Sequence, residues 1–211
     1  MAKQGIENLF SDTHLDILKE IGSMGTAHAA TALSKMINKK VTMPVPNVSW
    51  VEFKNVADFV GGPENVIVGL LVSLSGNIQG MMMHLLAVDD ARTLAAAVLG
   101  QPNTKTGEDK YVFSEMERSA IEELANILVS SYLGSLAGLT NSHIKPSVPF
   151  MSVDMANSIL SIPAIEYGKM ADKILFIESQ IAIEDISSTG CFILVPNLHS
   201  FYRILRSLGV E

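Results

Sequence analysis

The sequence predicts a mixed α/β fold in which two similar halves share one sheet, and this prediction rests on a repeated order of elements and on the instability of an isolated hairpin. Both halves show the same order of expected elements: a long helix, an extended segment with proline, a hairpin of two strands, and a short helix that ends at glycine. A hairpin of two strands is only marginally stable alone and needs more strands or a covering helix. Joining the halves would satisfy this need, since one mainly antiparallel sheet could then lie beneath the paired long helices.

The first half is expected to span residues about 12–100. Its elements are a long helix, an extended segment, a short helix, two strands and a closing helix, expected at residues 14–38, 41–51, 56–60, 66–74, 78–86 and 89–99. Glycine lowers helix propensity, so a break of the long helix is expected near Gly25. Pro44 and Pro46 have no backbone N–H to donate, which places the extended segment at a sheet edge or in a loop.

The second half is expected to span residues about 113–209, after a polar linker at about 101–112 that contains proline and glycine. Its elements repeat the order of the first half and are expected at residues 113–139, 150–155, 174–183, 191–195 and 200–208, with an irregular stretch at 157–169 and a turn at 184–190. Ser114 and Glu117 fit the Ser-x-x-Glu capping box of a helix start. All 211 residues are then expected to form a single domain.

The composition indicates a globular protein that neither binds nucleic acid nor inserts into a membrane. Hydrophobic residues make up 48% of the chain and charged residues 18%, which excludes a disordered chain. The net charge of −7 comes without a basic cluster, which argues against nucleic acid and anionic membranes as partners. No run approaches the ~20 apolar residues of a membrane helix, and residues 1–10 lack the features of a signal peptide. We therefore expect a cytoplasmic protein.

The single cysteine, Cys191, allows no disulfide within the chain, which is consistent with a reducing compartment. It lies in an apolar run, so we interpret it as a buried strand residue rather than a nucleophile. The consecutive methionines at 81–83 are interpreted as strand and core residues. No metal site is expected, because the histidines other than His28 are scattered without a pair at ligand spacing: His14, His84, His143 and His199.

The most specific signal lies in the expected long helix of the second half. Ser119, Glu123 and Asn126 stand at positions i, i+4 and i+7, which share one face of a helix. Pro149 follows at a fixed spacing, and the full pattern is Asp/Ser-x3-Glu-x2-Asn-x22-Pro. A near copy, with serine in place of the asparagine, occurs 103 residues earlier in Asp16, Glu20, Ser23 and Pro46.

This pattern resembles that of the CheC/CheX/FliY family of chemotaxis phosphatases, and most of all its CheC type. The resemblance covers nearly the whole chain, and residues 18–22 and 30–40 are similar to the first helix of the family. It implies a pseudo-twofold α/β domain with a continuous sheet under paired helices. It also implies a hydrolase of two-component signalling, which acts on the aspartyl phosphate of a CheY-like response regulator. No cofactor of its own is implied, since the regulator would supply Mg²⁺.

The resemblance implies distinct roles for the motif residues. An acyl phosphate is already reactive, so a helper protein need only position water and stabilise charge. Asn126 would orient the attacking water, because a carboxamide offers an acceptor and donors and does not titrate near pH 7. Glu123 would pair with a lysine of the regulator and fix the docked orientation. Ser119 and, in the first half, Asp16 would support the face.

The first half carries a second, degraded site by the same resemblance. Ser23 stands where the family pattern has asparagine, and its shorter hydroxyl could bond back to its own helix. Glu20 could still dock a regulator, but the positioning of water is not expected of Ser23. His28, on the same helix, is interpreted as a packing histidine rather than a catalytic one.

Three alternatives stay open. Glu123 and Asn126 could be ordinary solvated residues of an amphipathic helix. The chain could be an adaptor that binds a phosphorylated regulator, or a module that binds a CheD-like deamidase, with little catalytic activity. It could also dimerise like CheX-type proteins, although two halves favour a monomer that is already a pseudo-dimer. The complete motif of the second half favours the phosphatase.

Overall fold

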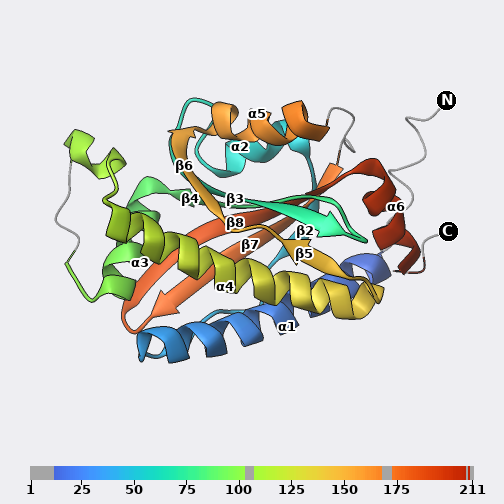
Figure 1. Cartoon of the computed structure of the whole chain (residues 1–211), viewed down its shortest axis with the longest axis horizontal. Coiled ribbons are helices and arrows are strands. Elements are labelled where there is room, and N and C mark those ends of the chain that lie inside the picture. The colour runs from blue at the N-terminus through green and yellow to red at the C-terminus, as the bar shows by residue number, and fades with distance from the viewer. Residues whose placement is uncertain (1–11, 103–106, 168–172, 208, 210–211) are drawn as a thin grey trace.

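The computed structural model describes residues 12–102, 107–167, 173–207 and 209 (Figure 1). The helices are α1 (Asp12–Ile37), α2 (Val56–Phe59), α3 (Val88–Leu99), α4 (Glu115–Thr140), α5 (Ala156–Tyr167) and α6 (Leu198–Ser207). The strands are β1 (Val41–Thr42), β2 (Val48–Glu52), β3 (Val66–Gly76), β4 (Gly80–Ala87), β5 (Ile144–Pro146), β6 (Phe150–Met155), β7 (Lys173–Ile183) and β8 (Ile186–Pro196). Within these residues, no helix has the length and hydropathy needed to cross a membrane.

The strands form one eight-stranded sheet that joins the two halves. Its order is β1-β7-β8-β4-β3-β5, with β2 also paired to β7 and β6 also paired to β3, and each of these pairs is antiparallel. The two halves meet at β4 and β8, and the edge strands of each half pair with the hairpin of the other half. The predicted fold class, two similar units sharing a mainly antiparallel sheet, is therefore confirmed, while the exact bounds of the units stay a prediction.

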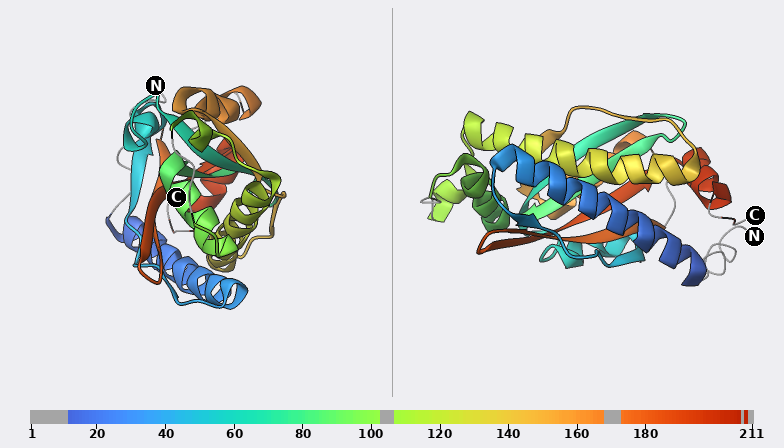
Figure 2. Two further views of the ribbon diagram at one scale, coloured as in Figure 1. Left: turned by 90° about the vertical axis from the view of Figure 1, so that its left-hand side faces the viewer. Right: turned by 90° about the horizontal axis from the view of Figure 1, so that it is seen from below.

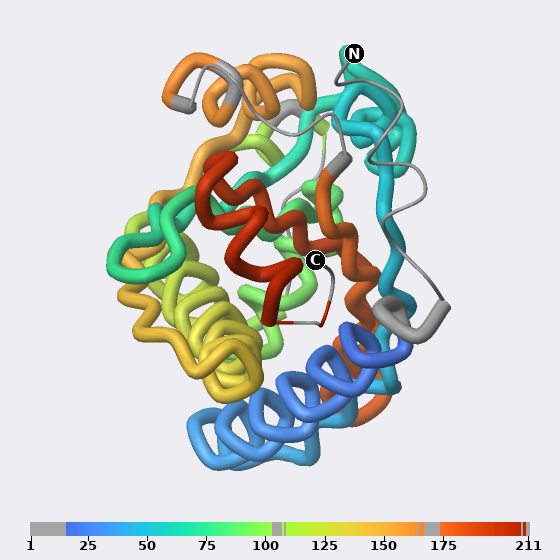
Figure 3. Tube along the Cα trace, turned by 90° about the vertical axis from the view of Figure 1, so that its right-hand side faces the viewer, coloured from blue at the N-terminus to red at the C-terminus, as the bar shows by residue number. Residues whose placement is uncertain are grey.

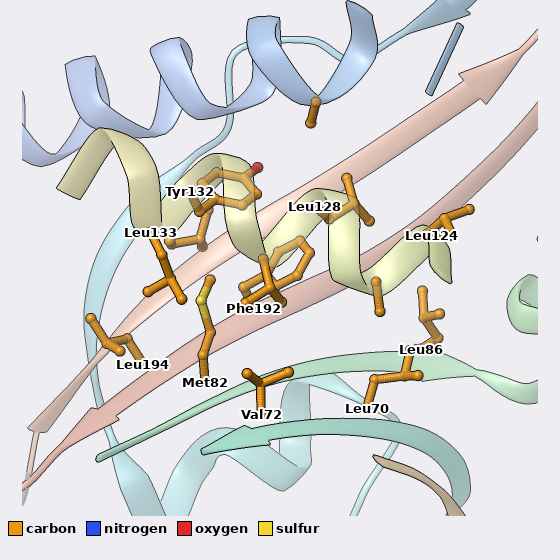
Figure 4. Close-up of a cluster of buried hydrophobic side chains, with 14 of the residues drawn as sticks. Leu70, Val72, Met82, Leu86, Leu124, Leu128, Tyr132, Leu133, Phe192 and Leu194 are labelled. Carbon is orange, nitrogen blue, oxygen red and sulfur yellow. The ribbon is translucent and has the colours of Figure 1, made fainter. Parts of the chain in front are cut away.

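Helices cover both faces of this sheet. On one face α1 and α4 pack side by side and run in opposite directions (Figure 2), while α2 and α5 lie on the other face (Figure 3). The core beneath α1 and α4 is apolar and includes Leu70, Val72, Met82, Leu86, Leu124, Leu128, Tyr132 and Phe192 (Figure 4). A second core under α2 and α5 includes Val56, Met81, Met83, Ile159, Leu160, Phe176 and Ile193. The methionines at 81–83 are thus core residues, as predicted.

The long first helix runs without a break, so the predicted break near Gly25 is wrong. A Cβ atom on Gly25 would lie 2.8 Å from Cδ1 and 3.1 Å from Cα of Tyr132 on α4. Such distances leave no room for a side chain, so glycine permits the close approach of the two helices. The packing gained between them outweighs the low helix propensity of glycine.

Residues 156–167 form the regular helix α5, although an irregular stretch was predicted there and Pro163 lies inside the helix. Ile159 and Leu160 are buried in the second core. Burial of these side chains on the sheet stabilises the helix by more than the proline costs.

The last strand, β8, begins at Ile186, although residues 184–190 were expected to be a turn. Its polar residues pair with β7, for example Ser188 with Ile181. The turn therefore shrinks to two residues, and Glu184 in it adopts a φ of 53°. Long-range pairing decides this segment, because its residues resemble a turn when only their local preferences are considered.

Cys191 lies on β8 in the second core and is buried, which confirms its interpretation as a strand residue. Burial, together with the nearby charge of Glu178, raises the pKa of its thiol to about 12. A thiol with this pKa stays protonated near neutral pH and is therefore a poor nucleophile.

His84 is a polar residue at the centre of the sheet. It is fully buried on β4, and its ring stacks on Phe192 with the ring centroids 4.1 Å apart. Neither ring nitrogen has a hydrogen-bond partner in the described part of the chain. Burial lowers the pKa of this imidazole to about 3, because the charged form cannot be solvated there.

The buried imidazole predicts a loss of stability in mild acid. Between the unfolded pKa of 6.5 and the folded pKa of about 3, the unfolded chain binds a proton that the folded chain does not. The free energy of unfolding should therefore decrease as the pH is lowered through this window. From this group alone, the decrease between pH 7 and pH 5 should be about 2 kcal/mol. Urea unfolding at both pH values should show a smaller pH dependence for His84→Leu. The same pH dependence in His84→Leu and wild type would contradict the prediction, and the exposed His199→Gln serves as the control.

Candidate functional site

The candidate site is the exposed face of α4. Ser119 and Glu123 are exposed and Asn126 is half-buried, all on one continuous helix. The opposite side of the helix, with Leu124 and Leu128, is buried against the sheet (Figure 4). The predicted helix and the exposed position of the motif on it are therefore observed, and the roles of the residues stay predictions.

The start of α4 is held by the predicted capping box, which is confirmed. Ser114 Oγ accepts a hydrogen bond from the backbone N–H of Glu117 at 3.3 Å, and Glu117 Oε2 accepts one from the backbone N–H of Ser114 at 2.7 Å. The other carboxylate oxygen of Glu117 pairs with Nη1 of Arg92 at 2.6 Å. Arg92 also lies 3.8 Å from the centre of the Phe113 ring. These contacts fix the first turns of α4, from which Glu123 extends.

Two further residues of α4 hold β6 against the helix. Glu122 Oε1 accepts a hydrogen bond from the backbone N–H of Met151 at 3.2 Å. Arg118 Nη1 donates to the carbonyl oxygen of the same residue at 3.4 Å. Glu122, Arg118 and the buried Arg92 are supporting residues that the sequence patterns did not reveal. The available signal for Arg92 was its position just before the apolar run at 94–98, where a charged side chain is unusual.

Glu123 and Asn126 differ from these neighbours, because neither side chain makes a hydrogen bond or ion pair with another residue in the described part of the chain. Asparagine also has a low helix propensity, so Asn126 is not required by the helix itself. A carboxylate and a carboxamide are thus left unengaged on one face. This arrangement can bind a partner that brings a cation and a polar reacting group.

In the first half, the proline of the near copy packs against α1. A Cβ atom on Gly22 of α1 would lie 2.9 Å from Cγ of Pro46 and 3.3 Å from Cγ2 of Val48. Pro46 is buried there, beside the turn of α1 that carries Ser23, and Pro149 is buried in the second half. In the first half, the spacing from Glu20 to Pro46 therefore brings the chain back onto α1.

The first-half residues form their own exposed stripe on α1. Asp16 and Glu20 are exposed, Ser23 is half-buried, and Asp16 makes an exposed ion pair with Lys19 at 3.6 Å. Such a pair contributes little to stability. The interpretation of His28 as a packing residue is wrong, because its side chain is exposed on the outer side of α1.

The structure keeps the two stripes apart. Gly25 of α1 contacts Tyr132 of α4, and the two helices run in opposite directions (Figure 2). Ser23 precedes the contact on α1 and Asn126 precedes it on α4. The two stripes therefore lie on opposite sides of the helix crossing, and each would act as a separate site.

Within the described residues, the groove with the best-formed walls is not lined by either stripe. This groove, of about 770 Å³, lies over residues of the second core and is lined in part by Phe59, Phe176 and Cys191. In the described ranges, no group of three or more histidine, cysteine, aspartate or glutamate side chains is placed to hold a metal ion. An exposed helix face with unengaged polar groups is typical of a site that docks another protein.

A sequence model described as the CheC-like family matches residues 14–49 and 116–153, which contain both stripes. The chain is 29% identical over 211 residues to the CheY-P phosphatase CheC of Bacillus subtilis (strain 168), covering 98% of this chain and 99% of that protein. Both matches show that the chain is similar to the CheC-like family.

Two other matches are consistent with this similarity. The flagellar motor switch phosphatase FliY of Bacillus subtilis (strain 168) is 26% identical over 139 residues, which are 66% of this chain and 35% of that protein. The crystal structure of Thermotoga maritima FliY shares the fold, with a TM-score of 0.73 at 20% identity over 95% of this chain and 98% of that chain.

Proposed function

We propose that this protein is a phosphatase that accelerates hydrolysis of the aspartyl phosphate of a CheY-like response regulator. The observation that carries the proposal is the pair Glu123 and Asn126, which are unengaged and share the outer face of α4. The activity for which the Bacillus subtilis relative is named, CheY-P phosphatase, supports the substrate class.

The reaction needs little from the phosphatase beyond positioning. The oxygen of a water molecule attacks phosphorus, the bond between phosphorus and the aspartyl oxygen breaks, and the aspartate leaves as a carboxylate while a proton passes to phosphate or solvent. Asn126 would accept a hydrogen bond from this water and hold it in line with the breaking bond. The regulator would supply the phosphoaspartate and the Mg²⁺ that neutralises the phosphoryl oxygens.

Glu123 would dock the regulator. Its exposed carboxylate can pair with a lysine beside the phosphorylated aspartate, and a complementary charge of this kind fixes the orientation of the complex. Because Glu123 and Asn126 lie three positions apart on one helix, the same docking would bring Asn126 to the phosphoryl group.

Replacing Glu123 by alanine should weaken docking more than chemistry. We expect KM for the phosphorylated regulator to rise about tenfold, with a smaller change in kcat, because the lost ion pair acts before and during the reaction alike. The measurement is the decay of radiolabelled phosphoregulator at increasing concentrations of the protein. Glu166→Ala, on the exposed side of α5, is the matched control. A KM for Glu123→Ala within twofold of wild type would contradict the assigned role.

A further inference from the structure

The groove of about 770 Å³ over the second core lies apart from the α4 face to which the proposed function belongs. Its floor is apolar and includes Leu85, Phe176 and Cys191, which are all buried. Its walls include the connector at 44–47 and the end of α2 at 59–61. Binding sites for small molecules have volumes of about 300–1,000 Å³ and apolar linings with a few polar groups. The groove therefore has the size and the lining of such a site.

The groove is open because the two halves cover this face of the sheet unequally. In the second half, β6 is followed by the twelve residues of α5, whereas α2, which comes after β2 in the first half, has four residues. At the end of the short helix, Phe59 is 53% exposed, and its ring lies against that of Phe176 with the ring centroids 4.5 Å apart. This pair offers an aromatic surface to a bound molecule.

Two carboxylates line the groove without a cation. Glu178 of β7 lies opposite Cys191 of β8, and its Oε1 accepts a hydrogen bond from Nδ2 of Asn47 at 3.2 Å. Asp90 belongs to α3, and its Oδ1 accepts a hydrogen bond from the backbone N–H of Thr189 at 2.9 Å. Among the described residues, neither carboxylate forms an ion pair, and no lysine, arginine or histidine lines the groove. Each carboxylate is thus held in place while its charge stays unbalanced.

We propose that this groove binds a small organic cation, namely an amine with an apolar or aromatic body. The ammonium group would pair with Glu178 and Asp90, because hydrogen bonds between charged groups are stronger than those between neutral groups. The body would lie on the apolar floor and against Phe59, whose ring face also attracts a cation. The same carboxylates disfavour an anion, and a neutral molecule gains only the apolar contacts. The proposal does not depend on the function proposed for α4.

Three probes of similar size and different charge test the class of ligand: 2-phenylethylamine, 2-phenylethanol and 3-phenylpropanoate. Each is titrated into ¹⁵N-labelled protein, and the backbone amide resonances of Phe176, Glu178 and Thr189 are followed. The Kd of the amine should be at least about tenfold below that of the alcohol, and the propanoate should give no saturable shift. No binding of the amine, an equal Kd for amine and alcohol, or shifts confined to residues outside the groove would overturn the proposal.

Two variants remove the charges and keep the oxygens that accept the hydrogen bonds of the walls. Glu178→Gln and Asp90→Asn should each raise the Kd of the amine at least about fivefold and leave that of the alcohol within about twofold. Glu166→Gln, which removes one exposed charge of α5 outside the groove, is the control and should leave both values unchanged. Wild-type affinity for the amine in both groove variants would overturn the assigned role of the carboxylates. No response regulator takes part, so the outcome is independent of the phosphatase activity.

Discussion

Replacing Arg92 by methionine should destabilise the protein by about 3–5 kcal/mol, which is the range typical of removing one partner of a buried ion pair. Arg92 is 2% exposed, and its guanidinium pairs with Glu117 and donates to the carbonyl oxygens of Lys110 and Val112. Methionine fills much of the volume but leaves the carboxylate of Glu117 without this cation. Urea unfolding followed by circular dichroism measures the loss, with the exposed Arg206→Met as the control, which should change stability by less than about 0.5 kcal/mol.

A second variant separates the charge from the packing. Arg92→Met combined with Glu117→Gln removes the uncompensated charge, so the double variant should be more stable than Arg92→Met alone. A free energy of unfolding for Arg92→Met within about 1 kcal/mol of the wild-type value would contradict this prediction. It would show that the cluster around Arg92 does not hold the start of α4.

Replacing Asn126 by alanine should reduce the accelerated decay of the phosphoregulator by about a hundredfold or more. Loss of one group that is positioned for the transition state typically has an effect of about 10²–10³ on kcat. Docking should be retained, because Glu123 is intact and Asn126 has no partner in the described structure whose loss would disturb the helix. The rate constant at saturating protein concentration is the quantity to measure.

The matched control for this variant is Ser130→Ala. Ser130 is exposed one turn farther along α4, so its substitution alters the same face without touching the motif. A saturating rate for Asn126→Ala within threefold of wild type would show that the amide does not position the water.

The features that could be predicted from the sequence are those set by local spacing. The Ser114 and Glu117 capping box is visible in four residues, and the helical period places Ser119, Glu123 and Asn126 on one face. The hairpin of β3 and β4 and the final glycine of α3 also follow from local turn and cap preferences.

The features that could not be predicted depend on contacts between distant segments. The pairing of β2 with β7 and of β6 with β3 exchanges edge strands between the halves, which no local preference specifies. The continuity of α1 at Gly25 depends on Tyr132, which is more than a hundred residues away. Local pattern also could not separate Glu122, which holds β6, from the unengaged Glu123.

The most direct test of the account is to observe Asn126 itself in the complex. Its side-chain NH₂ resonance in ¹⁵N-labelled protein can be assigned by its absence from the spectrum of Asn126→Ala. Adding a regulator activated by beryllofluoride and Mg²⁺ should shift or broaden this resonance, and adding the unactivated regulator should do so far less. An unchanged Asn126 resonance at concentrations where the activated regulator is bound would contradict the claim that this face of α4 enters the phosphorylated site.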